Sequence, residues 1–387
     1  MNVLLVNHLL DAVSGGGTAE RTLQLARGMA QAGVDCTLLA LDIGLTPERR
    51  DALKFARLEA VHCLNTRYFI PRLSMRRVRE LVFAADIVLV SGHWTVINAM
   101  VALACRQVGR PYLFAPAGAL APFGRSLLLK RVYDIAAGQS MVRGASSCIA
   151  VTEAERADFA PYGIEAGQVP VIPNGIDPAD YRSADPLREG LAFRARAGLG
   201  QARFAMFLGR LNLIKGPDLL VEAFASLSDR MPDLHLVMAG PDDGMLPALQ
   251  ALVLSRGLAQ RVHFTGFLGG ADKAAALREA SLLVIPSRRE AMSIVVLEGG
   301  ACGCPVLFTD ACGLEDIARR GAGAMVAPSA AALATEMERL LQDGSACAEM
   351  AGLLQQIVEQ EYSWTAQAQR HIALAVHCLG GIAQEAG

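Results

Sequence analysis

The feature of this sequence that most constrains its fold is the alternation of short apolar runs with amphipathic segments of helical length. Apolar runs that stop at Gly, Pro or Asn are typical of buried parallel strands. The first series predicts strands at 2–7, 34–41, 86–91, 111–115 and 146–151, and helices at 19–32, 74–84, 96–108 and 126–141. The second series predicts strands at 204–209, 234–239, 262–265, 282–285, 305–308 and 324–326, with helices in the gaps. The alternation therefore predicts an α/β protein with two doubly wound parallel sheets.

A turn-rich segment, Pro173-Asn174-Gly175-Ile176-Asp177-Pro178, separates the two series. We therefore predict an N-terminal Rossmann-like domain over 1–172 and a C-terminal Rossmann-like domain over 173–360, facing each other across a cleft. A chain of 387 residues is long enough for two such cores.

The composition indicates in which cellular compartment the protein is expected. No apolar run approaches the roughly 18 residues that a membrane-spanning helix needs. Residues 1–10 are apolar but lack a basic start and a cleavage site, so we interpret them as a first strand. The nine cysteines are scattered and form no C-x-x-C pair, which favours free thiols in a reducing compartment. We expect a cytoplasmic protein.

The net charge of −2 hides a basic segment. Residues 60–133 hold ten basic residues and only two acids, Glu80 and Asp86. Sparse aromatic residues and an acidic remainder argue against nucleic-acid binding. Two interpretations stay open: a solvated basic face, or contact of residues 67–79 with an anionic membrane surface or a phosphorylated acceptor.

One strand-loop-helix stretch, residues 281–302, carries two glutamates eight positions apart. The predicted strand stops at Pro286, Glu290 falls in the loop, and Ser293 is a plausible N-cap. Glu298 then lies two turns inside the helix, so both carboxylates can border the helix N-terminus, which suits a phosphate. This geometry fits a nucleotide-sugar, with sugar hydroxyls on Glu290 and ribose hydroxyls on Glu298. The alternative is two solvated glutamates beside an ordinary turn.

Basic side chains follow another strand of the second series. Arg210 and Lys215 lie five positions apart in a loop that ends at Gly216-Pro217, a sharp helix start. Arginine offers a planar fork to phosphate oxygens and lysine offers a point charge. Because carboxyl ends of parallel strands share one edge, we expect this loop to meet those at 240–242, 266–268 and 286–293.

Loops of the first series also follow strand ends. The glycines at 15–17 follow the first strand, but the pattern is not G-x-G-x-x-G and no acid ends the second strand, so a dinucleotide site is not expected. His93 follows the strand at 86–91, and Ala117-Gly118 follow the strand at 111–115. His93 either faces a ligand or serves the structure.

The combined motifs resemble the retaining glycosyltransferases of family 4, which have the GT-B fold. The resemblance covers nearly the whole chain. It rests on Gly15-Gly16-Gly17, Ile172-Pro-Asn-Gly-Ile-Asp177, Gly209-Arg210-x4-Lys215-Gly216, Ser287…Glu290-x7-Glu298 and Gly303-x-Pro305-Val306.

The resemblance implies a nucleoside-diphosphate-sugar donor and assigns roles to its site residues. Arg210 and Lys215 would bind the diphosphate and, with Glu290, form the catalytic set. Glu298 would bind the ribose. The remaining donor contacts would be the amides of Met292, Ser293 and Ile294, the base-bordering Gly266, Phe267 and Leu268, and Gly16 and Gly17 over the phosphates. The acceptor-side candidates are His93, Ala117 and Gly118. The last helix, within 361–387, would cross back to the first domain.

The sequence departs from the family pattern at two places. Met292-Ser293 stand where Phe-Gly is usual, which a backbone contact tolerates. Ala117 stands where many members have histidine, with His93 as the nearby substitute, and this affects recognition of the acceptor or of the sugar hydroxyls more than the reaction.

The function implied is transfer of a sugar, with retained configuration, to a hydroxyl of a glycan or lipid-linked acceptor in cell-surface polysaccharide biosynthesis. No metal or cofactor is expected, since Arg210, Lys215 and a helix terminus supply positive charge and no Asp-x-Asp motif is present. The alternatives are a degenerate sugar-nucleotide-binding protein and a GT-B nucleotide-sugar epimerase.

Overall fold

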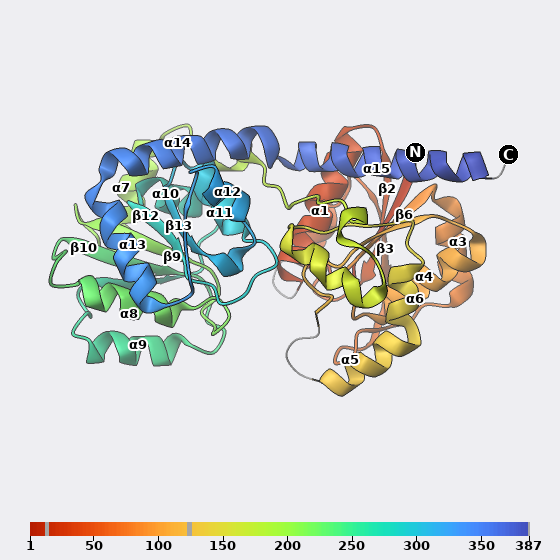
Figure 1. The fold of residues 1–387 in the computed structure, drawn as a ribbon, viewed down its shortest axis with the longest axis horizontal. Coiled ribbons are helices and arrows are strands. Elements are labelled where there is room, and N and C mark those ends of the chain that lie inside the picture. The colour runs from red at the N-terminus through yellow and green to blue at the C-terminus, as the bar shows by residue number, and fades with distance from the viewer. Residues whose placement is uncertain (12–14, 122–125, 386–387) are drawn as a thin grey trace. The chain divides into compact units, whose positions relative to one another are not determined.

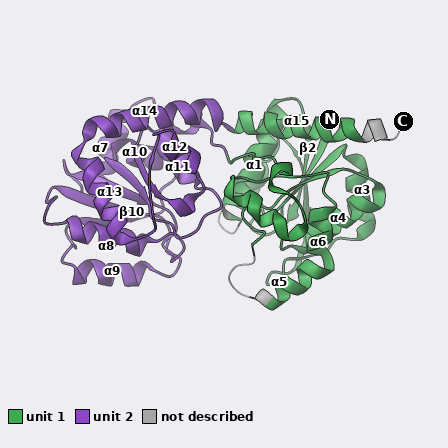
Figure 2. Ribbon diagram, viewed as in Figure 1, with its two compact units in different colours: residues 1–174, 364–387 green, residues 175–363 purple. Residues whose placement is uncertain are grey.

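The computed structural model describes residues 1–11, 15–121 and 126–385. The chain divides into two compact units (Figure 2). Unit 1 comprises residues 1–174 and 364–387, and unit 2 comprises residues 175–363.

Unit 1 contains, within its described residues, a six-stranded sheet of order β3-β2-β1-β6-β7-β8 (Figure 1). All its pairs are parallel. Its strands are β1 Asn2–Val6, β2 Asp35–Leu41, β3 Arg57–Val61, β6 Ile87–Ser91, β7 Tyr112–Ala115 and β8 Ser147–Cys148. The chain winds outward from β1 to β3 and then resumes at β6 on the other side, which is the switch of a doubly wound sheet.

Helices cover both faces of this sheet. The main ones are α1 Gly16–Gln31, α3 Met75–Ala84, α4 Val96–Val108 and α15 Trp364–Glu385. Leu4 and Val6 pack with the residues of α3 and α4, while Val3 and Leu5 pack with those of α1 and α15. Alternate residues of β1 therefore contribute to two hydrophobic cores, one on each face of the sheet.

Shorter segments complete unit 1. They are the helix α2 Pro47–Asp51, the hairpin β4 Cys63–Asn65 and β5 Ile70–Pro71, the helix α5 Leu127–Tyr133, a π-helical turn Asp134–Gly138, the helix α6 Gln139–Arg143, and the 3₁₀ segments Ala154–Tyr162 and Ala166–Gln168.

Unit 2, all of which is described, repeats the same winding with the order β11-β10-β9-β12-β13-β14. Its strands are β9 Arg203–Leu208, β10 Leu234–Ala239, β11 Val262–Gly266, β12 Leu282–Ile285, β13 Val306–Thr309 and β14 Ala324–Val326. Its helices are α7 Pro186–Ala197, α8 Pro217–Leu227, α9 Leu246–Ser255, α10 Gly270–Glu279, α11 Ile294–Ala301, α12 Glu315–Arg319, α13 Ala330–Gln342 and α14 Gly344–Glu361, with 3₁₀ segments Pro178–Tyr181 and Asp310–Cys312.

The predicted fold class, two doubly wound α/β units, is confirmed, and the local differences have simple causes. Strand β3 and the hairpin β4–β5 were missed because their half-exposed, charged residues obscure the apolar pattern. The helix predicted over 126–141 is three segments ending at Arg143, interrupted by the π-helical turn. The strand predicted over 146–151 shrinks to two residues, followed by a lone bridge between Ala150 and Val171.

The chain changes units at two points. Unit 1 ends at Asn174, inside the turn-rich segment, and resumes at Trp364, the first residue of α15. Within unit 1, α15 packs along α1 and contributes Ala368 and Ala375 to the shared core.

No helix in the part of the chain that the structure describes is long and apolar enough to cross a membrane.

Candidate functional site

The candidate donor site lies in the loops at the carboxyl ends of the unit 2 strands. Strands β9, β10, β11 and β12 run parallel, so the loops that follow them emerge at one edge of the sheet. Ligands of doubly wound sheets bind at this edge. Two ion pairs, each between a predicted glutamate and a lysine, lie along it.

Glu290, in the loop between β12 and α11, is held by two groups. Its Oε2 lies 2.9 Å from Lys215 Nζ, and Ser287 Oγ–H donates to its Oε1. The side chains of Glu290 and Lys215 are 8% and 24% exposed, so the pair borders solvent without being freely hydrated. Because the pair borders solvent, a ligand can reach it and replace one of the two partners.

The loops that bring Lys215 and Glu290 together are fastened to each other. Arg288 donates to both carboxylate oxygens of Asp218 at 2.8 and 2.6 Å, and its backbone N–H donates to Ile214 O. The side-chain bonds to Asp218 raise the pKa of Arg288. Gly216 has φ +67°, and a Cβ there would lie 2.1 Å from Pro286 O, so glycine is required where the loops touch.

Glu298, on the second turn of α11, forms a separate cluster. Its Oε1 accepts from Lys273 Nζ at 2.7 Å and from the Tyr181 hydroxyl at 2.8 Å, and its side chain is 12% exposed. Burial and the Glu298 charge raise the pKa of Tyr181, which therefore remains a donor. Neither contact uses Oε2, which leaves a carboxylate oxygen for a hydroxyl donor.

Arg210 and Lys215 contact different carboxylates. Its side chain is 63% exposed, and its Nη1 lies 3.2 Å from Asp243 Oδ2. Asn212 joins the two parts of this loop, because its Nδ2 donates to Asp243 and its Oδ1 accepts from the Lys215 backbone N–H. Lys215 reaches Glu290, whereas Arg210 reaches the loop after β10.

One predicted backbone contact is wrong for this structure. The Ser293 N–H already donates to Cys312 O at 3.0 Å, so it does not point to a phosphate. Ser293 precedes α11 as predicted, but its buried hydroxyl makes no capping bond. Met292 is buried. Ile294 is the first residue of α11, so its N–H has no acceptor within the helix.

The loop predicted to border the base follows β11. Gly266 ends that strand with φ +70°, which turns the chain sharply, and Phe267 is then 76% exposed. Leu268 is partly exposed. An exposed aromatic face beside the edge is a natural stacking surface for a planar base.

The glycines of unit 1 are not in a loop as predicted. Gly16 and Gly17 are the first two residues of α1, which begins three residues earlier than expected. A Cβ at Gly17 would meet no atom within 4 Å. This open first turn follows β1 at the carboxyl edge of the unit 1 sheet.

The acceptor-side assignment of His93 needs correction. Its side chain is fully buried, with Nε2 3.1 Å from Asp134 Oδ1 and edge-on contacts to Trp94, Tyr133 and Tyr162. Burial lowers the pKa of His93. His93 is a core residue that orders an aromatic cluster, so it offers nothing to an acceptor in this structure. Ala117 and Gly118 remain partly exposed after β7.

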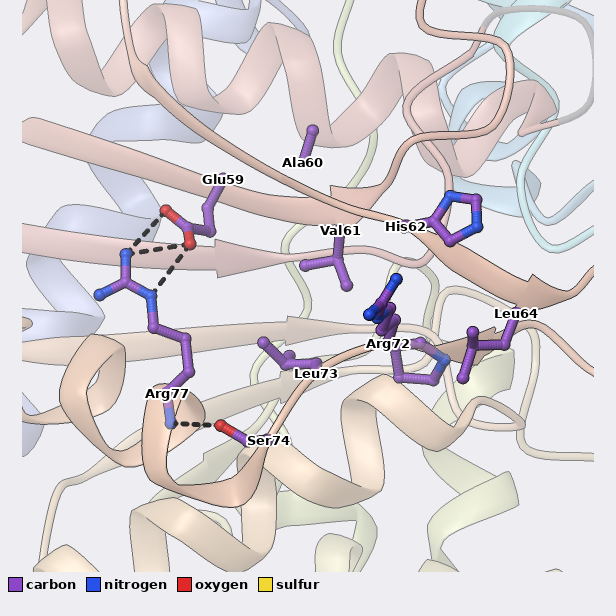
Figure 3. A pocket seen from close by; sticks show the side chains of 10 residues that line it. Glu59, Ala60, Val61, His62, Leu64, Arg72, Leu73, Ser74 and Arg77 are labelled. Carbon is purple, nitrogen blue, oxygen red and sulfur yellow. Dashed lines mark hydrogen bonds and ion pairs between the residues drawn. The ribbon is translucent and has the colours of Figure 1, made fainter.

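The predicted basic surface of unit 1 is partly neutralised. Arg77 is bound by both carboxylate oxygens of Glu59 and also contacts Glu80, which pairs with Arg76. Figure 3 shows Arg77 turned toward Glu59 at one side of a hollow of about 700 Å³. Its lining comprises Glu59, Ala60, Val61, His62, Leu64, Pro71, Arg72, Leu73, Ser74 and Arg77.

Sequence reasoning missed two residues of the unit 2 edge, Lys273 and Tyr181. Both touch Glu298, from 25 and 117 positions away in the chain. Lys273 had a signal, since it lies in the first turn of the helix that follows the 266–268 loop. Tyr181 had none beyond its place just after the turn-rich segment.

Two doubly wound Rossmann-like units in one chain, with the terminal helix returned to the first of them, define the GT-B class of fold. Two sequence families match the chain: "Glycosyl transferase 4-like domain" over residues 16–175 and "Glycosyl transferases group 1" over residues 192–353. The chain belongs to the glycosyltransferases of family 4.

Two curated relatives match about half to two thirds of the chain. A D-inositol 3-phosphate glycosyltransferase of Jonesia denitrificans is 30% identical over 197 residues, which is 49% of this chain and 46% of that protein. D-inositol 3-phosphate glycosyltransferase 1 of Catenulispora acidiphila is 32% identical over 259 residues, covering 63% and 60% respectively. The chain thus spans about half the length of the first such relatives.

The fold is shared over its full length with solved structures. Alr3699/HepE of Anabaena, solved in complex with UDP and glucose, superposes with a TM-score of 0.79 at 21% identity. The match covers 97% of this chain and 99% of that one.

Proposed function

We propose that this protein transfers a sugar from a nucleoside-diphosphate donor to an acceptor hydroxyl and retains the configuration of the anomeric carbon. The observation that carries the proposal is the pair of glutamate–lysine contacts, Glu290–Lys215 and Glu298–Lys273, along the ligand-binding edge of unit 2. Family membership supports the reaction class.

Lys215 would act on the departing diphosphate. Its ammonium is held in place by Glu290 and by the fastened loop, so its charge needs little rearrangement when a phosphate arrives. Preorganised positive charge stabilises the leaving group as the glycosidic bond breaks. Arg210 would add a second cation once its exposed contact with Asp243 is exchanged for phosphate.

Glu290 and Glu298 would hold different parts of the donor. Glu290 would bind the sugar hydroxyls next to the reacting carbon, and Glu298 would use its Oε2 for the ribose. Retention is assigned to a front-face reaction in which the departing phosphate oxygen takes the acceptor proton. Both Glu290 oxygens are engaged by Lys215 and Ser287, which suits positioning better than nucleophilic attack.

The names of the relatives support a choice of substrates to test. Alr3699/HepE was solved with UDP, glucose and UDP-glucose, so a uridine diphosphate-hexose is the first donor to test. Relatives named D-inositol 3-phosphate glycosyltransferases make a polyol phosphate the first acceptor, beside glycan and lipid-linked hydroxyls. A role in polysaccharide assembly belongs to the same proposal.

The reaction is proposed to need neither metal nor cofactor. Among the described residues, no group of three or more His, Cys, Asp or Glu side chains is arranged to hold a metal ion. Lys215 and Arg210 would supply the charge that a cation provides elsewhere. Transfer measured in EDTA should match transfer with added Mg²⁺ or Mn²⁺.

Contact with anionic lipid through residues 67–79 is retained as a proposal about location. It would depend on Arg67, Arg72 and Arg79, since Arg76 and Arg77 are paired with acids. Binding to anionic vesicles that vanishes at high salt would support it. Equal binding to neutral vesicles at low salt would reject it.

The test of the function is a transfer assay with a panel of labelled sugar nucleotides. D-inositol 3-phosphate, simple glycosides and a lipid-linked sugar serve as acceptors, and NMR reports the anomeric configuration. We expect one donor to yield a retained product. An isomerised donor without transfer would instead indicate an epimerase, and binding without turnover would indicate a degenerate protein.

A further inference from the structure

The loop after β7 in unit 1 contains a turn whose conformation the sequence does not favour. Ala117 and Gly118 have φ of +51° and +83°, and Ala119 N–H donates to Pro116 O at 3.1 Å. Two successive positive φ values inside such a bond are the pattern of a type I′ turn. Asn or Gly usually occupies the first position, since the Cβ of alanine crowds the backbone there.

Two side chains hold the turn from outside. Glu155 Oε1 accepts the Gly118 N–H, and Trp94 Nε1–H donates to Ala119 O. Without such contacts an Ala-Gly turn would readily leave the left-handed region. The turn therefore depends on contacts with groups 25 and 37 positions away in the sequence.

Glu155 links this loop to the next one along the sheet. Its second oxygen, Oε2, accepts the Val151 N–H at 2.6 Å, after β8. Its own N–H is capped by Thr152 Oγ1. Only a carboxylate fits this place, since both of its oxygens accept and a glutamine would set an NH₂ group against one of the N–H donors.

The charge of Glu155 is balanced inside the unit. Glu155 is 5% exposed and Arg21, on α1, is 3% exposed. Burial raises the pKa of Glu155, while the two N–H groups and Arg21 act in the opposite direction. Arg21 is in turn anchored by Asn174 Oδ1 at 2.9 Å. The turn thus rests on a buried arrangement of four separate segments, α1, the β7 loop, the β8 loop and residue 174.

We propose that Glu155 is a positioning residue that fixes the Ala117–Gly118 turn, and that the turn sets how tightly the sugar acceptor binds. The inference rests on the proposed transfer reaction. The turn lies at the carboxyl end of a parallel strand, where ligands of such sheets bind, and Ala117 is partly exposed there. Backbone strain of this kind is characteristic of ligand-binding loops.

The experiment compares the wild-type chain with Glu155→Gln, Ala117→Asn and the double variant. Glu153→Gln is the matched control, since Glu153 is exposed and pairs with Arg156 on the surface. Amide hydrogen exchange of the peptide containing Gly118 reports on the turn, with a peptide from α4 as reference. Transfer assays with the donor and acceptor found by the panel give kcat and both KM values.

We expect Glu155→Gln to speed exchange at Gly118 and to raise the acceptor KM, each by about tenfold or more, the worth of a hydrogen bond to a charged group. The donor KM should not change. In the double variant, the Asn-Gly pair favours the turn by itself. Its acceptor KM should therefore lie within about threefold of the value for Ala117→Asn alone.

Unchanged exchange in Glu155→Gln would overturn the proposal, as would faster exchange with an unchanged acceptor KM. Equal losses in the double variant and in Glu155→Gln would indicate a general structural role and also overturn it. If the wild-type chain transfers no sugar at all, the proposed function fails and the acceptor role fails with it. The exchange data would then still show whether Glu155 holds the turn.

Discussion

The two units share one strand order but place their charged side chains differently. At the carboxyl edge of unit 2, Lys215–Glu290 and Lys273–Glu298 form pairs whose side chains are between 8% and 24% exposed. In unit 1, Arg21 and Glu155 are at most 5% exposed. The same topology therefore carries rim charges in one unit and interior charges in the other.

The difference indicates that the charged side chains of the two units have different roles. When a ligand replaces one partner of a charged pair at the rim, little electrostatic free energy is lost, because both charges already border water. Exchanging the partner of a buried charge costs much more free energy, because the charge is left unpaired away from water. Buried charges therefore hold backbone positions instead. This contrast supports the proposal that unit 2 carries the donor chemistry and that unit 1 positions a recognition loop.

The largest expected effect is on the rim of unit 2. Lys215→Ala and Arg210→Ala should each reduce transfer by about 10²-fold or more, because each removes a cation from the developing phosphate charge. Assays at saturating donor and acceptor measure this loss. The matched control is Lys54→Ala, which breaks an exposed ion pair with Asp51 in unit 1. Wild-type rates in the Lys215 variant would remove that residue from the reaction.

A second effect tests the buried interior of unit 1. Burial lowers the pKa of His371 to about 3. As the pH falls below 6.5, the unfolded chain binds a proton that the folded unit excludes, so the free energy of unfolding should fall. For this group the loss between pH 7 and pH 5 is about 2 kcal/mol.

Tryptophan fluorescence can follow this loss, since Trp94 and Trp364 both lie in unit 1. Urea unfolding at pH 5, 6 and 7 gives the free energies. His371→Gln should make the pH dependence less steep, and His377→Gln, at an exposed position on the same helix, is the control. A His371→Gln protein with the wild-type slope would show that the titration lies elsewhere.

The smallest expected effect concerns the support of Glu298. Tyr181→Phe removes one hydrogen bond to a carboxylate that Lys273 still holds, which is worth about 1.5 kcal/mol. We expect a rise of several-fold, up to about tenfold, in the donor KM with kcat little changed. Tyr68→Phe, an exposed tyrosine of unit 1, is the control. A large fall in kcat would instead place Tyr181 at the reacting sugar.

The fold was predictable because most strands are buried on both faces and end at turn residues. Strand β3 was not predicted because its charged residues Arg57 and Glu59 are typical of a loop. In the structure, Glu59 accepts a hydrogen bond from Arg77. The interruption of the helix at 127–143 has no local signal in the sequence, although Gly138 at its end lies close to His93, where a Cβ would come within 2.8 Å of Nε2.

The site was predictable only to the level of loops. Strand ends placed Glu290, Glu298 and Lys215 at one edge, but side-chain partners depend on tertiary contacts. Lys273 meets Glu298, and Arg210 meets Asp243, through contacts that no local spacing encodes. The interpretation of His93 failed for the same reason, since a strand-end histidine is buried here by aromatic rings from distant segments.

The central claim is that Glu290 meets the reacting sugar and Glu298 only the ribose of the same donor. The most direct measurement is the kinetics of Glu290→Gln and Glu298→Gln against varied donor at saturating acceptor, with Glu336→Gln as the control for a surface pair. We predict that Glu290→Gln mainly lowers kcat, because its bonds strengthen toward the transition state, and that Glu298→Gln mainly raises the donor KM. Unchanged kinetics in both variants would contradict the account and leave two glutamates that serve only the fold.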